Sequence, residues 1–202
     1  MNFATARANM IESQVRTNDV SDLALQTAMR AVARESFVVE AKREFAYAEV
    51  VVPSPSGRYL WKPRDFSKLA QASKIVAGER VLVIGGAAGY SAAVFAQMGC
   101  SVTIFDNIAC SFPGIVSESG DLRTPPSGPF DVIFVDGGVD SVPDSWSDAL
   151  AEEGRLCVVI LSGPMGVAKI MTKSGGVVAG RTVFDAMVPR LPGFEAVASF
   201  SF

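Results

Sequence analysis

The apolar side chains change their spacing near residue 79, and this change divides the chain into two sections. Before it, apolar residues recur every three or four positions, which predicts helices that bury one face. After it, short apolar runs alternate with helical stretches, a pattern typical of a parallel sheet whose strands are joined by helices. We therefore predict an α/β protein with a doubly wound sheet in residues 79–202, a helical section in residues 1–78, and one domain over residues 1–202.

The first section contains three predicted helices and one short helical turn. Asp19 or Ser21 is expected to cap the second helix, and the third begins after Pro63 and Asp65. The predicted helices cover residues 3–18, 22–33 and 66–75, and the turn covers residues 39–43.

The second section contains five predicted strands, two helices and a closing β-hairpin. The strands are expected at residues 81–84, 101–105, 115–117, 131–135 and 156–161. The helices are expected at residues 90–98 and 145–152, and the hairpin pairs residues 167–172 with 177–184.

A glycine-rich turn separates the first predicted strand from the helix that follows it. The turn runs from Gly85 through Gly86 and Ala87 to Gly89. Glycine lets the backbone approach a ligand closely, and the N-terminus of a helix offers free N–H groups to it. These four residues are therefore the candidate binding residues for a nucleotide-like cofactor.

Composition and charge narrow the classes of partner. Hydrophobic residues make up 49% of the 202 residues, but no apolar run reaches the roughly 20 residues of a membrane span. The net charge of −3 gives no basic field for nucleic acid. The first residues lack the layout of a signal peptide, so we expect a cytoplasmic protein that binds neither membrane nor nucleic acid.

Histidine is absent from the sequence, which excludes Ser-His-Asp hydrolysis and histidine zinc sites. The three cysteines are scattered, as expected of reduced thiols. No set of oxygen ligands for a metal ion is evident near Asp136, which we expect to cap the turn or helix after the fourth strand.

Three blocks of sequence resemble the protein-L-isoaspartate O-methyltransferase family, within the S-adenosylmethionine-dependent methyltransferases. The first resembles the helical N-terminal section of that family, the second its glycine loop, and the third its later strand and turn. These blocks are residues 10–17 with 28–38, residues 81–93, and residues 128–133 with 151–156.

The resemblance implies a Rossmann-like class I methyltransferase fold and a function. That function is methyl transfer from S-adenosyl-L-methionine to a carboxylate of a damaged protein or peptide. A carboxylate acceptor is ionised at pH 7 and needs no general base, which suits a chain without histidine.

The resemblance also assigns roles to single residues. Gly85 and Gly89 match the outer glycines of the family loop, whereas Ala87 replaces the middle one and Val83 replaces an acid. Asp106 matches the acid that bonds the ribose hydroxyls, and Asp121 follows a glycine as in the pair near the adenine. An alternative interpretation makes Asp106 a solvated loop residue and Asp121 part of an ordinary turn.

Two further regions depart from the family pattern. The segment from residue 107 to 114 is too short for the helix expected between two parallel strands. On the acceptor side, Trp61 falls where the family has a serine, and Tyr59 and Lys62 are the other candidates for contact with the acceptor. Tyr59 and Trp61 are otherwise expected to be buried anchors. Arg58 and Lys62 are able to attract a carboxylate, and are otherwise expected to be solvated charges.

Three functions therefore stay open. The chain is an active methyltransferase, an inactive relative that binds or assembles with another protein, or a sensor that binds the cofactor without turnover. The departures at Val83, Ala87 and Trp61 favour the inactive relative. The apolar composition is also compatible with a homodimer.

Overall fold

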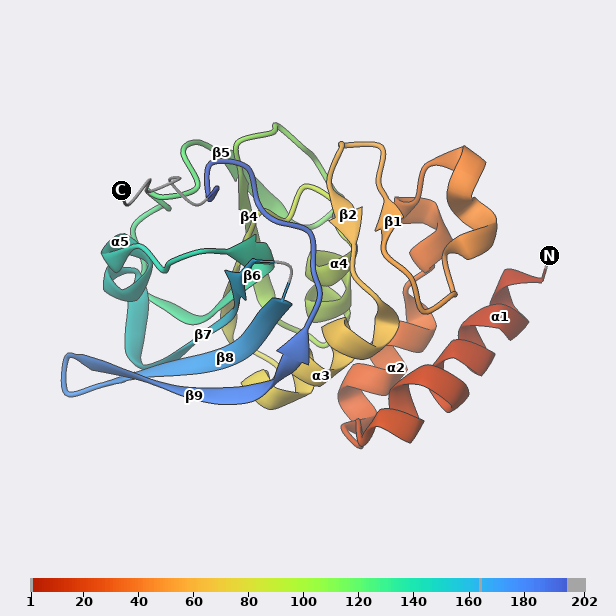
Figure 1. Cartoon of the computed structure of the whole chain (residues 1–202), viewed down its shortest axis with the longest axis horizontal. Helices are drawn as coiled ribbons and strands as arrows, with labels where there is room; N and C mark the ends of the chain where they lie inside the picture. Colours follow the sequence, from red (N-terminus) through yellow and green to blue (C-terminus); the bar gives the residue numbers. More distant parts are fainter. Residues whose placement is uncertain (1, 164, 196–202) are drawn as a thin grey trace, which may run out of the picture.

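The computed structural model describes residues 2–163 and 165–195, and a seven-stranded sheet forms its centre (Figure 1). The strands are β3 (Arg80–Ile84), β4 (Ser101–Asp106), β5 (Val116–Ser119), β6 (Phe130–Val139), β7 (Leu150–Ser162), β8 (Met165–Ser174) and β9 (Val177–Ala186). Their order is β5-β4-β3-β6-β7-β8-β9. The first five are mutually parallel, and β7, β8 and β9 pair antiparallel. The predicted doubly wound sheet with a closing hairpin is confirmed.

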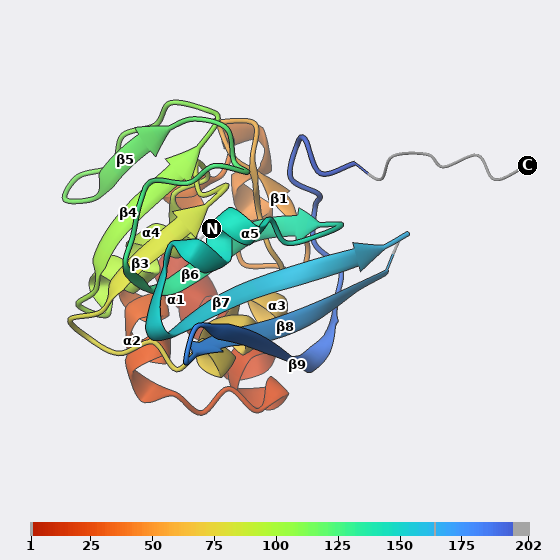
Figure 2. The ribbon, with the colours of Figure 1, turned by 90° about the vertical axis from the view of Figure 1, so that its left-hand side faces the viewer.

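Most of the helices pack on one face of the sheet, and one short helix packs on the other (Figure 2). The well-covered face carries alternate strand residues such as Val81 and Phe134, which pack with helical side chains in one apolar cluster. The opposite face carries Leu82 and Ile133, which pack with Trp146 and with loop residues. The helices are α1 (Phe3–Met10), α2 (Leu23–Ala31), α3 (Pro63–Ser73), α4 (Tyr90–Gln97) and α5 (Asp144–Asp148), of which only α5 contributes to the second cluster.

The helical section differs from the prediction in its details. α1 continues as a π-helical turn, Ile11–Val15, and a 3₁₀ turn, Arg16–Asn18. The expected caps of α2 are wrong, because Asp22 is the residue whose side chain accepts a hydrogen bond from the Leu25 N–H, at 3.0 Å. A further 3₁₀ turn, Glu40–Phe45, takes the place of the predicted turn at residues 39–43.

The predicted helix at residues 145–152 is wrong in its second half. α5 ends at Asp148, and strand β7 already begins at Leu150. The Phe130 N–H donates to the Ala149 carbonyl oxygen at 2.9 Å, so the neighbouring strand captures this segment. Sheet pairing therefore overrides a helical pattern that extends over these few residues.

Two segments outside the main sheet lie beside its carboxyl edge. One is a short hairpin of β1 (Val52–Pro53) and β2 (Tyr59–Leu60). The other is residues 187–194, called the strap here, which follows β9 and passes along the ends of the strands (Figure 1). Two backbone hydrogen bonds of 2.8 Å join the strap to Gly138 of β6.

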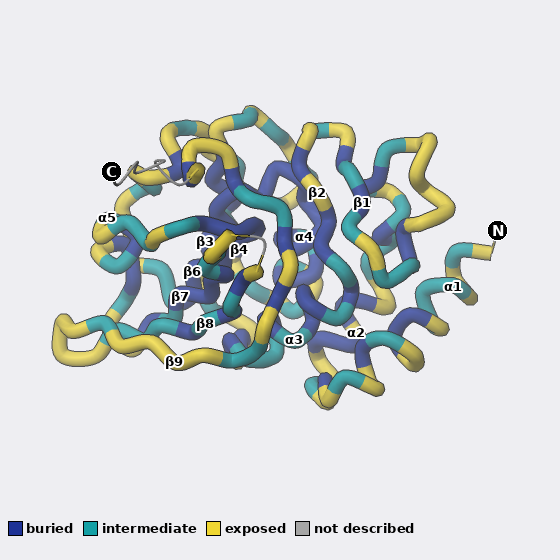
Figure 3. The backbone as a smooth tube through the Cα atoms, in the orientation of Figure 1, coloured by how far each residue is buried: buried dark blue, intermediate teal, exposed yellow. Residues whose placement is uncertain are grey.

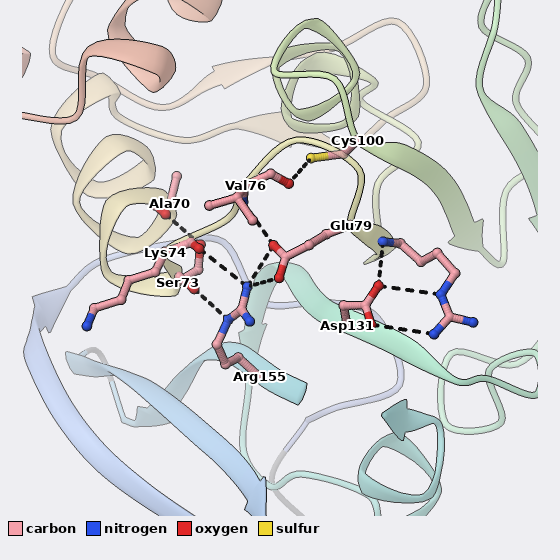
Figure 4. A network of polar contacts seen from close by, with 9 residues as sticks. Ala70, Ser73, Lys74, Val76, Glu79, Cys100, Asp131 and Arg155 are labelled. Atoms are coloured by element: carbon pink, nitrogen blue, oxygen red, sulfur yellow. Dashed lines mark hydrogen bonds and ion pairs between the residues drawn. The ribbon is translucent and has the colours of Figure 1, made fainter. Parts of the chain in front are cut away.

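A polar network ties α3 to the opposite, amino edge of the sheet (Figure 4). Arg155 of β7 donates to the Ser73 carbonyl oxygen at 2.7 Å and to both carboxylate oxygens of Glu79 at 2.8 Å. Nearby, Asp131 accepts from the backbone N–H of Arg80 at 2.8 Å. The carboxyl edge, where the candidate site lies, is free of this network.

In the part of the chain that the structure describes, no helix has the length and apolar character needed to cross a membrane.

Candidate functional site

The glycine turn adopts the backbone conformation that its sequence predicts. Gly85 and Gly89 have φ angles of 75° and 83°, a region that favours glycine. Gly89 is also the N-terminal cap of α4, and the Gly85 N–H donates to the Phe105 carbonyl oxygen at 2.8 Å. The turn thus joins β3 to α4 at the carboxyl edge of the sheet.

Side chains of the protein itself cover both outer glycines of this turn. A Cβ atom placed on Gly85 would lie 2.6 Å from Leu191 of the strap, which also packs on Gly137 (Figure 3 shows the strap running over the buried strand ends). A Cβ atom on Gly89 would overlap the ring of Phe112, which in turn packs near Phe37. The space above the turn is therefore filled by apolar groups.

Asp106, at the end of β4, is fully buried and bound on both carboxylate oxygens. Arg58 donates from Nε to Oδ2 at 3.1 Å and from Nη2 to Oδ1 at 2.5 Å. The backbone N–H groups of Ala87 and Ile108 donate to the same two oxygens at 2.9 and 3.2 Å. Arg58 is thus no solvated charge, as its loop position suggested, but the buried partner of Asp106.

Asp136 lies inside strand β6, so the expected role as a cap is wrong. Its side chain is buried, and Oδ2 accepts a hydrogen bond of 2.5 Å from the Ser91 hydroxyl. Burial raises the pKa of Asp136 to about 7, and the nearby negative charge of Asp106 acts in the same direction. Asp136 therefore keeps its proton to a much higher pH than an exposed aspartate does.

The three acceptor-side candidates have different surroundings. Trp61 is buried, and its Nε1 has no hydrogen-bond partner among the described residues. Tyr59 is 46% exposed, so the expectation that it is a buried anchor is wrong. Lys62 is half-buried at the start of α3. Tyr59 and Trp61 line one cavity of about 80 Å³ with Asp136 and the strap, and Lys62 is not part of its lining.

Arg34 is a buried residue that contacts this site and was not among the predicted site residues. It donates from Nη2 to the Trp61 carbonyl oxygen and from Nε to the Ala46 carbonyl oxygen, at 2.7 Å for the latter. Its guanidinium lies 4.6 Å from the centre of the Tyr90 ring, and burial lowers its pKa. Arg34 thus fixes the backbone that carries Trp61, a role that has no local sequence signal.

Asp121 lies beside a second cavity, of about 120 Å³, together with Asn107 and the strap residues Pro192 and Phe194. Its Oδ1 accepts from the Arg123 N–H at 3.0 Å, which makes an ordinary local turn. Between residues 107 and 115 the structure has no helix, as the length of the segment predicts. The two cavities share Pro192 of the strap, and Leu191 lines only the cavity of about 80 Å³.

The sheet order, the glycine turn after a central strand and the acid at the end of the next strand define a Rossmann-like class I methyltransferase fold. A solved protein-L-isoaspartate O-methyltransferase superposes with a TM-score of 0.80 at 23% identity, covering 93% of this chain and 66% of that chain. A Plasmodium falciparum beta-aspartate methyltransferase in complex with S-adenosyl-L-homocysteine superposes with a TM-score of 0.77 at 18% identity, covering 92% of this chain and 97% of that chain.

The family model for protein-L-isoaspartate(D-aspartate) O-methyltransferase matches residues 5–108 and 114–189, and the chain belongs to this family. A relative from Rhodopseudomonas palustris, protein-L-isoaspartate O-methyltransferase 1, is 33% identical over 172 residues, which are 78% of this chain and 70% of the relative. The unmatched residues 109–113 lie in the shortened connection between β4 and β5.

The family uses S-adenosylmethionine, in agreement with the cofactor that the sequence suggested. The side chains of this structure do not fit that group as they are arranged. The two cavities hold about 80 and 120 Å³, whereas small-molecule sites usually hold about 300–1,000 Å³. Leu191 and Phe112 lie over the turn glycines, and Arg58 holds Asp106.

Proposed function

We propose that this chain is a non-catalytic member of its family, which binds a protein or peptide partner without using S-adenosylmethionine. The observation that carries the proposal is the covered glycine turn, where Leu191 and Phe112 occupy the approach to Gly85 and Gly89. A cofactor that needs contact with this backbone would have to displace both side chains.

Two substitutions support the same proposal from opposite sides of the site. Val83, in the place of the family acid, is fully buried in β3 and offers no charge to a cofactor ammonium group. Trp61, in the place of the family serine, fills the acceptor side with an indole whose only polar atom is a single N–H donor. Neither side retains the polar group that the family pattern places there.

The test is calorimetric titration of the full chain with S-adenosylmethionine and S-adenosylhomocysteine, beside a thermal-shift measurement at millimolar ligand. We expect no saturable heat and no change of melting temperature, while an active relative titrated in parallel binds both. Micromolar binding by this chain would contradict the proposal.

Methyl transfer to a carboxylate of a damaged protein is the second candidate. It is favoured by the left-handed turn at Gly85 and Gly89 and by the presence of Asp106, which are kept despite the changes around them. If the titration shows binding, methyl release from an isoaspartyl peptide separates this activity from that of a sensor, which binds without turnover. A cytoplasmic location and a homodimer are further proposals, the second tested by sedimentation of the full chain.

A further inference from the structure

The carboxylate of Asp106 has no free hydrogen-bonding position. A carboxylate offers about four lone-pair sites, and Asp106 accepts four hydrogen bonds, two on each oxygen. Two come from backbone N–H groups of the surrounding loops, and two come from the side chain of Arg58. Only the Arg58 pair can leave without rebuilding the backbone.

We infer that the Arg58 guanidinium is an internal occupant of the position where Asp106 would bind a cis-diol, and that it is the group that makes this chain reject ribonucleosides. The inference rests on the proposed function, because it names the residue that excludes the nucleoside half of the cofactor. It assigns Arg58 a role in ligand specificity that its position in a loop does not indicate.

The geometry of the two donors supports this assignment. A guanidinium presents two parallel N–H groups to one carboxylate, as two neighbouring hydroxyls would, and it adds a positive charge. Arg58 reaches Asp106 from the β1–β2 hairpin, 48 residues earlier, and is 7% exposed. A third hydrogen bond, from Nη2 to the Asn107 side-chain oxygen at 2.5 Å, holds it in place. A neutral diol cannot compete with this charged and already positioned group.

The surroundings show what the removal of Arg58 would uncover. The Ala87 and Ile108 N–H groups would keep the Asp106 carboxylate in its orientation. Asn107, beside it, lines the 120 Å³ cavity that extends toward Asp121. Leu191 and Phe112 would still cover the glycine turn, so the test needs a ligand smaller than the whole cofactor that carries the cis-diol. Adenosine alone is therefore the appropriate ligand for a test.

The experiment compares the unmodified chain with Arg58→Ala by calorimetric titration and thermal shift with adenosine and 2′-deoxyadenosine. Arg155→Ala is the matched control, because it removes a partly buried arginine that also binds a carboxylate, from Nη2 to both oxygens of Glu79, at the opposite edge of the sheet. We expect adenosine to bind Arg58→Ala at least about tenfold more tightly than the other two proteins. 2′-Deoxyadenosine should bind Arg58→Ala about tenfold more weakly than adenosine does, because it lacks one hydrogen bond to a charged group.

Three results would overturn the inference. They are a folded Arg58→Ala protein that adenosine does not stabilise, equal binding of the two nucleosides, and a similar gain in Arg155→Ala. If Arg58→Ala does not fold, Arg58→Met keeps the aliphatic packing and is read in the same way. Cofactor binding by the unmodified chain would instead contradict the proposed function, so the two failures are distinguishable.

Discussion

The raised pKa of Asp136 makes the stability of the protein depend on pH. The ordinary value is 3.8 and the folded value is about 7, so the folded chain binds more protons than the unfolded chain between these limits. Stability should therefore be fully present below about pH 4, fall as the pH rises, and reach its lower level above about pH 7.

Asp136→Asn should remove most of this dependence, because asparagine is neutral and can still accept the hydrogen bond of Ser91. We expect the variant to gain of order 2–4 kcal/mol over the unmodified chain at pH 8 and much less at pH 4. Urea unfolding at both pH values measures the difference. Asp131→Asn is the control, and its effect on the pH dependence of stability should have the opposite sign. The reason is that hydrogen bonds from Arg80 lower the pKa of Asp131. An unchanged pH profile for Asp136→Asn would contradict the burial argument.

Single residues differ in how far the sequence could place them. Gly85, Gly89 and Asp106 lie at the carboxyl edge as predicted, because each follows a strand whose apolar run is local in sequence. The contact of Arg58 with Asp106 and that of Leu191 with Gly85 were not predicted, because these residues come from segments 48 residues before Asp106 and 106 residues after Gly85. The spacing of apolar residues carries no information on such a contact, because the contact depends on how the β1–β2 hairpin and the strap pack on the folded sheet.

Among the elements, α3 depends on its polar attachment to the amino edge of the sheet. Arg155→Ala should lower the free energy of unfolding by about 1–3 kcal/mol, because it leaves the partly buried carboxylate of Glu79 and the Ser73 carbonyl at the end of α3 without their donor. Arg80→Ala, whose side chain is 48% exposed in the neighbouring pair, should cost about 0–1 kcal/mol. Denaturant unfolding of both variants measures the contrast, and equal losses would contradict it.

The elements that the sequence predicted well are those with strong and local patterns. Strands β3, β4 and β6 were found because each carries a mostly apolar run of four or five residues that ends at a glycine or an acid. The end of α5 was missed because residues 149–152 carry a helical pattern but pair with the start of β6. The local spacing of apolar residues cannot show that a segment prefers a strand to a helix when its partner strand lies 20 residues away in the sequence.

At the scale of the whole molecule, the two apolar clusters should unfold together. They lie on opposite faces of one sheet, and neighbouring residues such as Val81 and Leu82 belong to different clusters. The sequence has two tryptophans, Trp61 in the first cluster and Trp146 in the second. Trp61→Phe and Trp146→Phe therefore give one fluorescent reporter for each face.

We expect the fluorescence transitions of these two variants in urea to coincide with their own circular-dichroism transitions, as for one cooperative domain. This outcome would support the prediction that residues 1–202 form a single domain. Unfolding of one face at a clearly lower urea concentration than the other would contradict the single-domain prediction. A shift of the urea midpoint that is the same in fluorescence and circular dichroism would reflect only the substitution.

The strap gives the molecule a mechanical asymmetry. Near Gly138 the strap is attached to β6 by two backbone hydrogen bonds and by the packing of Leu191. Strand β9, which precedes the strap, is instead paired with β8 along nearly its whole length. A force applied from the C-terminal side therefore acts on the contacts of the strap before it acts on the hydrogen bonds of the sheet. Traction on that side, from a tether or an unfoldase, would lift Leu191 away from Gly85 and expose the glycine turn while the strands stay paired.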